Sequence, residues 1–223
     1  MKNITGLERI KTFLSLLFGL LLIFPTTLLS QQDIPFKILE SSRLYIEGKS
    51  NVNSFTCDCK EDFPPAKMRL NSTANSNVAY FHETRVEITT EKLDCGNKGI
   101  NRDLSKALKA DEYPKICFEL CSITFQEAAH YDEWQNVKAN ADITIAGKTK
   151  RVKMDIKAKQ MADGQLAIKS SKAINMSDFG IDPPTVLMGL IKVKDEISLF
   201  FDLDIKVLKP LNGSPNGKID PLK

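Results

Sequence analysis

Four stretches of the chain alternate apolar and polar side chains residue by residue, at positions 116–125, 139–145, 152–158 and 197–207. A period of two is the signature of a β-strand with one buried face and one solvent-facing face, because successive side chains of a strand point to opposite sides. Such alternation is typical of antiparallel sheets, whereas strands buried on both faces are continuously apolar. The pattern therefore predicts a mainly antiparallel β protein.

Further β-like runs occupy residues 43–48, 52–59 and 80–93. Tight turns are predicted at Ala146-Gly147-Lys148 and at Ala162-Asp163-Gly164. Residues 60–77 are polar and contain proline, so we expect a long surface connection with one short strand near 67–70. About eight strands result, enough for a sheet to close into a small barrel without free edges. We therefore expect an all-β single domain, an eight-stranded antiparallel barrel with one or two short helices.

One stretch departs from the β pattern. In residues 101–110, Leu104, Ala107 and Leu108 share one helical face, and Asn101 can cap the first turn. A helix this short is marginal in water, so we expect it to dock on an apolar surface such as the mouth of a barrel. Pro114 then ends the turn before the next strand.

The two ends of the chain differ from the rest. Basic residues precede an apolar run at 13–24, and Ser30 is a small residue before Gln31, in the order of a secretory signal peptide. The apolar run is shorter than the roughly 20 residues of a membrane-spanning helix. We expect residues 1–30 to be a signal peptide that is cleaved near Ser30. Residues 210–223, rich in proline and glycine, are expected to be a disordered tail.

Charge argues against a nucleic-acid partner. The chain has 31 Lys and Arg and 28 Asp and Glu, and residues 1–30 hold three of the former and one of the latter, so the remainder carries +1. A nearly neutral chain of mixed sign lacks the basic surface of a nucleic-acid binder. His82 and His130 stand in no Cys-x-x-Cys or His-x-x-x-His unit, so neither a metal centre nor a cofactor is expected.

Export would place the five cysteines in an oxidising compartment, which favours disulfides. They are Cys57, Cys59, Cys95, Cys117 and Cys121. Two bridges and one free thiol can be arranged in 15 ways, so spacing alone does not fix the pairing. Cys117 and Cys121 lie about 13 Å apart along one extended strand, further than a disulfide spans. A bridge between Cys57 and Cys59 is also disfavoured.

Four segments, in the same order along the chain, resemble those of the YceI-like proteins in the variant that carries cysteines. Residues 101–120, NRDLSKALKADEYPKICFEL, resemble the family's Arg-Asp-Leu, short helix and Tyr-Pro-x-Ile-x-Phe signature. Residues 141–156, ADITIAGKTKRVKMDI, are similar to its hairpin with a Gly-Lys-Thr turn. Residues 174–205 resemble the family's segment of Asp-Phe-Gly, a helical link and a final strand. Residues 42–57 are similar to its opening strands.

The resemblance implies a lipocalin-like barrel over residues 31–209, exported to the bacterial periplasm, with an elongated apolar cavity for a polyisoprenoid chain. The family's Arg-Asp-Leu and Asp-Phe-Gly segments, which help to cover and shape the barrel, correspond here to residues 102–104 and 178–180. The resemblance also favours a bridge between Cys57 and Cys95. It leaves Cys59 for Cys117 or Cys121.

The alternating apolar side chains are the candidate ligand-binding residues. We expect them to line a tunnel for an isoprenoid tail, stabilised by about 25 cal/mol per Å² of buried apolar surface; the alternative is that they simply fill the barrel. They are Phe118, Ile143, Ile145, Met154, Ile156, Leu199, Phe201 and Leu203. Phe179 is expected in the pocket wall, whereas Gly180 can instead serve a turn. Arg102 and Asp103 either fix a polar head group or form a local ion pair and helix cap.

Together these features predict non-enzymatic binding, with sequestration or transport of an isoprenoid-type lipid in the periplasm, and the helix at 102–110 as part of a lid. The alternative is a structural or stress-response module with a filled barrel and an external interaction surface. No histidine spacing points to a reactive thiol, so no catalytic residue is expected. The sequence neither requires nor excludes a homodimer.

Overall fold

The structure, a computed structural model, describes residues 32–72, 77–125, 133–161, 164–186 and 190–208. All of them lie in one compact unit, Gln31–Lys223. The expected signal peptide, the expected tail, His130 and most of the turn at 162–164 fall outside the described residues. Within the described residues, no helix is long and apolar enough to cross a membrane.

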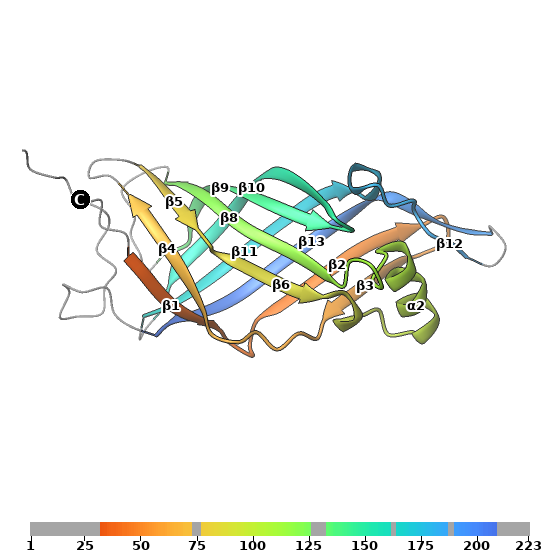
Figure 1. The fold of residues 1–223 in the computed structure, drawn as a ribbon, viewed down its shortest axis with the longest axis horizontal. Coiled ribbons are helices and arrows are strands. Elements are labelled where there is room, and N and C mark those ends of the chain that lie inside the picture. Colours follow the sequence, from red (N-terminus) through yellow and green to blue (C-terminus); the bar gives the residue numbers. More distant parts are fainter. Residues whose placement is uncertain (1–31, 73–76, 126–132, 162–163, 187–189, 209–223) are drawn as a thin grey trace, which may run out of the picture. The chain divides into compact units, whose positions relative to one another are not determined.

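The described residues form thirteen strands and three short helices (Figure 1). The strands are β1 (Gln32–Ile38), β2 (Arg43–Ser50), β3 (Ser54–Cys59), β4 (Ala66–Ser72), β5 (Val78–His82), β6 (Arg85–Thr89), β7 (Leu93–Asp94), β8 (Lys115–Phe125), β9 (Gln135–Ile145), β10 (Lys148–Gln160), β11 (Gln165–Asn175), β12 (Thr185–Val186) and β13 (Ile191–Val207). The helices are the α-helix α2 (Lys98–Ala107) and the 3-10 helices η1 (Thr90–Lys92) and η3 (Met176–Phe179).

The strands combine into a closed ring of eight antiparallel wall strands. β1 and β2 both pair with β13, at Phe36 opposite Val207 and at Arg43 opposite Asp202, so they are two parts of one wall strand. In the same way β3 and β4 are two parts of a second wall strand, and β5, β6 and β7 are three parts of a third. β8, β9, β10, β11 and β13 complete the ring, in which each wall strand pairs with the next in sequence. The predicted eight-stranded antiparallel barrel is confirmed.

The connection between β9 and β10 is also confirmed. Ala146 and Gly147 link the two strands and both have positive φ, 47° and 75°, as a two-residue hairpin turn requires. Because this turn sets the register, eleven consecutive residue pairs join β9 to β10, from Lys148 opposite Ile145 to Ala158 opposite Gln135.

Two expectations about the strands are wrong. The short strand expected near 67–70 is present as β4 (Ala66–Ser72), but it is longer than expected and pairs with both β1 and β5 as part of the barrel wall, so residues 60–77 are not mainly a surface connection. The strict alternation across residues 116–125 is interrupted by a register shift between Leu120 and Ser122. This irregularity places Ile123, rather than Ser122, beside Leu120 in an inner cluster.

The interior of the ring is filled unevenly. Away from α2, on the side of β1 and β4, Phe36, Ile38 and Ile205 are buried and pack together (Figure 1). A second cluster forms around Ala139, Ala141 and Met154. The largest cluster includes residues of η3 and contacts α2, and it surrounds the cavity described below.

Candidate ligand pocket

A mainly apolar cavity of about 460 Å³ lies inside the α2 end of the barrel. This volume is within the range of small-molecule binding sites, roughly 300–1,000 Å³. Inward-facing positions of β2, β3, β8 and β13 supply much of its wall, and α2, η3 and the segment before β12 contribute the rest. An apolar wall with few polar groups suits a hydrophobic guest.

Six of the predicted site residues line this cavity. They are Asp103, Phe118, Ile145, Phe179, Leu199 and Phe201. The rings of Phe118 and Phe201 meet edge to face with their centroids 4.8 Å apart, the T-shaped arrangement that aromatic pairs prefer. Phe179, at the end of η3, is only 2% exposed.

The other predicted residues lie elsewhere. Ile143 is completely buried in the core that surrounds the cavity, and Met154 is buried in the cluster with Ala139 and Ala141. Ile156 and Leu203 are partly buried against the filled part of the interior. The Arg102 side chain is 70% exposed, and its Nε lies 3.7 Å from Asp103 Oδ1. The predicted apolar residues are thus divided between the cavity wall and the packed clusters beside it.

Several wall residues were not singled out from the sequence. β2 contributes Leu44 and Ile46, and β3 contributes Phe55, Cys57 and Cys59. All of them stand at alternate positions within their strands, which is the signal that would have found them. Gly48 belongs to the same inward series, and a Cβ there would lie 2.3 Å from Phe55 Cζ. Glycine at this position therefore makes room for the Phe55 ring.

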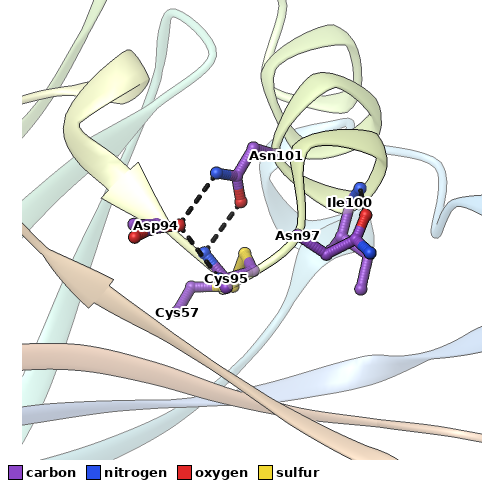
Figure 2. The surroundings of a disulfide bond; sticks show 7 residues. Cys57, Asp94, Cys95, Asn97, Ile100 and Asn101 are labelled. Carbon is purple, nitrogen blue, oxygen red and sulfur yellow. Dashed lines mark hydrogen bonds between the residues drawn. A yellow bond between two sulfur atoms is a disulfide. The ribbon is translucent and has the colours of Figure 1, made fainter.

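Helix α2 is fixed to the barrel wall at its N-terminal end (Figure 2). The predicted disulfide between Cys57 and Cys95 is confirmed and joins β3 to the segment before the helix. The Asn101 side chain accepts a hydrogen bond from the Cys95 backbone N–H at 2.8 Å and donates one to Asp94 Oδ1 at 2.9 Å. The helix therefore cannot move away from β3 at this end without breaking these bonds.

The predicted start of the helix is wrong. The helix begins at Lys98 rather than Asn101, and Asn97 is its N-cap, with Oδ1 accepting hydrogen bonds from the backbone N–H groups of Gly99 and Ile100. Asn101 lies inside the helix, where its side chain bonds to the preceding segment. Both asparagines are suitable caps by residue type, so residue type alone does not distinguish them.

The expected second bridge is absent among the described residues, in which Cys59, Cys117 and Cys121 are free. Cys59 lines the cavity, whereas Cys117 precedes the cavity-lining Phe118 and so points to the opposite face of β8. Cys121 contacts Arg151 of β10, with the arginine Nη2 3.6 Å from its Sγ. The barrel wall therefore separates Cys59 from both expected partners.

Burial raises the pKa of all three free thiols above the usual value. A raised pKa keeps a thiol protonated near neutral pH, and the protonated form is a poor nucleophile. In the described part of the chain, no group of three or more His, Cys, Asp or Glu side chains is placed to hold a metal ion.

A second hollow, of about 340 Å³, lies where β10 and β11 diverge. These strands pair over only five residues each, from Ile156 opposite Ser170 to Gln160 opposite Leu166. The hollow is largely polar, and its charged lining includes Lys150, Lys172, Asp178 and Glu196. Ile174 and Phe179 line both this side hollow and the apolar cavity.

The fold and the cavity define a class of protein, closed antiparallel β-barrels with an internal apolar pocket. Within that class the chain belongs to the YceI-like family, because the YceI-like domain model matches residues 45–205. A comparison with curated proteins finds no match.

Solved structures support the fold. BcnA from Burkholderia cenocepacia is 17% identical, with a TM-score of 0.54 over 74% of this chain and 96% of that chain. A polyisoprenoid binding domain from Saccharophagus degradans, implicated in plant cell wall breakdown, is 11% identical, with a TM-score of 0.57 over 77% of this chain and 98% of that chain. At these identities, the similarity concerns the fold alone.

Proposed function

We propose that this protein binds a hydrophobic, isoprenoid-type lipid inside its barrel and sequesters or transports it in the periplasm after export. The observation that carries the proposal is the apolar cavity of about 460 Å³ at the α2 end of the barrel, next to the packed apolar clusters of the interior. Membership of the YceI-like family supports it, as does the fold shared with a domain whose name describes polyisoprenoid binding.

The mechanism is solvation of the lipid tail by the barrel wall. Each methylene group that leaves water for such a wall contributes about 0.8 kcal/mol, so a short apolar chain is enough for stable binding. Branched isoprenoid units match a wall of isoleucine, leucine and phenylalanine side chains, and the binding step needs no covalent chemistry. The raised pKa of the three free thiols agrees with a non-enzymatic role.

Helix α2 serves as part of the lid. Ile100 and Leu104 line the cavity from the helix, and Leu108 follows directly after it. The disulfide holds the N-terminal end of the lid, so exchange of the lipid takes place around the opposite end of α2.

Native mass spectrometry of protein purified from its own host tests the proposal. A carrier retains an extractable lipid, whereas a structural module with a filled barrel does not. Phe201→Arg places a charge in the cavity wall and is expected to reduce lipid retention. Ser171→Arg adds the same charge on an exposed position of β11 outside the cavity lining and should retain the lipid. Equal lipid content in both folded variants would contradict the assigned cavity.

Export is tested separately. Cell fractionation should place the protein in the periplasm, and its N-terminus should lie near Gln31. A cytoplasmic protein that begins at Met1 would refute the proposed location, but it would leave lipid binding unaffected.

A further inference from the structure

The polar side chains that line the cavity indicate which kind of lipid head group it can accept. Among the described residues that line it, none is lysine, arginine or histidine, and Asp103 is the one charged residue. Neutral polar side chains come from β2, from the turn that follows it and from the cap of α2. A ligand head group inside this cavity therefore meets one negative charge and no positive charge.

Hydrogen bonds within the protein already engage three of the neutral side chains, those of Ser50, Asn53 and Asn97. Ser50 Oγ donates to Asn53 Oδ1 at 2.9 Å. Asn97 Oδ1 accepts from the backbone N–H groups of Gly99 and Ile100 at 2.8 and 3.3 Å. These contacts engage the side-chain amide oxygens of Asn53 and Asn97.

Asp103 differs from these groups. It forms a local ion pair with Arg102, whose Nε lies 3.7 Å from Asp103 Oδ1, beyond hydrogen-bond distance, and whose side chain is largely exposed to solvent. A carboxylate accepts hydrogen bonds through two oxygens and donates none while it is ionised. Asp103 is therefore suited to accept a hydrogen bond from the ligand.

We propose that the cavity selects lipids with an uncharged, hydrogen-bond-donating head group, such as an isoprenoid alcohol, and discriminates against phosphate and diphosphate head groups through Asp103. The inference rests on the proposed function and narrows its ligand class. A phosphate in the cavity would lose its hydration without gaining a cation, and it would lie near a carboxylate of the same sign. An alcohol loses less hydration and finds an acceptor.

The side hollow between β10 and β11 contains cationic side chains, but they do not supply a positive charge to the apolar cavity. Four cationic residues, Lys150, Arg151, Lys153 and Lys172, line it together with the carboxylates of Asp178 and Glu196. Ile174 and Phe179, both buried, line the hollow and the apolar cavity and stand between them. A head group in the hollow would thus be separated from a tail in the cavity.

The test compares geranylgeraniol with geranylgeranyl diphosphate on delipidated protein, by isothermal titration at low ionic strength. The alcohol is expected to bind roughly tenfold or more tightly than the diphosphate, a difference that titration resolves readily. Asp103→Asn should reduce this preference and Asp103→Lys should reverse it. Asp111→Asn, the same change on an exposed residue outside the cavity, should leave the preference unchanged.

The outcomes separate the inference from the function on which it rests. If the diphosphate binds as tightly as the alcohol, the head-group selectivity is overturned while isoprenoid binding stands. If Asp103→Asn and Asp111→Asn give the same preference, Asp103 is not the selecting residue and the proposal is wrong. If neither ligand binds, the proposed function itself fails.

Discussion

Removal of the disulfide tests how α2 is held on the barrel. The double variant Cys57→Ser/Cys95→Ser opens a bridge between residues 38 positions apart. Closing a loop of that length in the unfolded chain corresponds to about 4 kcal/mol at 25 °C in the chain-entropy relation. With a urea slope of about 2–3 kcal/mol/M, the unfolding midpoint should fall by roughly 1.3–2 M.

The assay is urea unfolding followed by circular dichroism, with hydrogen exchange as a local readout. The control variant Cys117→Ala/Cys121→Ala also removes two cysteines, but both are free thiols. Exchange in the disulfide variant should rise most at residues 95–107, because the bridge tethers the segment that leads into α2. A midpoint shift no larger than that of the control, or unchanged exchange at α2, would refute this reasoning.

Three further predictions follow from particular contacts. Thiol titration of the denatured, unreduced protein should count three free thiols, whereas a count of one would mean a second bridge. In the native protein, the raised pKa of these thiols should slow their alkylation at pH 8 relative to an exposed cysteine. Asn97→Ala should lower the free energy of unfolding by about 1 kcal/mol, and Asn97→Asp should restore most of it, as measured by thermal unfolding. Gly147→Ala should lower the free energy of unfolding more than Gly164→Ala. Both glycines have φ near +70°, but only at Gly147 would a Cβ meet the Tyr113 ring, at 2.4 Å. Equal unfolding free energies of the two variants would exclude the clash.

Much of the fold was predictable because alternation is a local property. The period of two in residues 139–145 and 152–158 predicted β9 and β10, and the turn at Ala146 and Gly147 predicted their pairing. The strand β4 was not recognised as part of the wall, because its polar sequence becomes a wall strand only through its pairing with β1 and β5. Nor could a local pattern show the register shift after Leu120, which depends on the neighbouring strand β9.

The candidate site was predictable only in part. Inward positions look alike in sequence whether the interior beside them is open or filled. Phe201 and Leu203 are two residues apart on the same face of β13 and both pack against the largest cluster, yet Phe201 lines the cavity and Leu203 does not. What lies across the barrel from each residue decides the difference.

The sequence by itself determined the alternation of apolar and polar side chains along the wall strands, the number of these strands and the presence of a helix that must dock on an apolar surface. Spacing alone allowed 15 arrangements of two bridges, and the family resemblance selected Cys57 with Cys95. The tertiary structure decided that Cys59 is free in the cavity wall, that Asn97 rather than Asn101 caps α2, and which end of the barrel is hollow. These outcomes depend on distances between segments far apart in the chain, and such distances are set only when the ring closes.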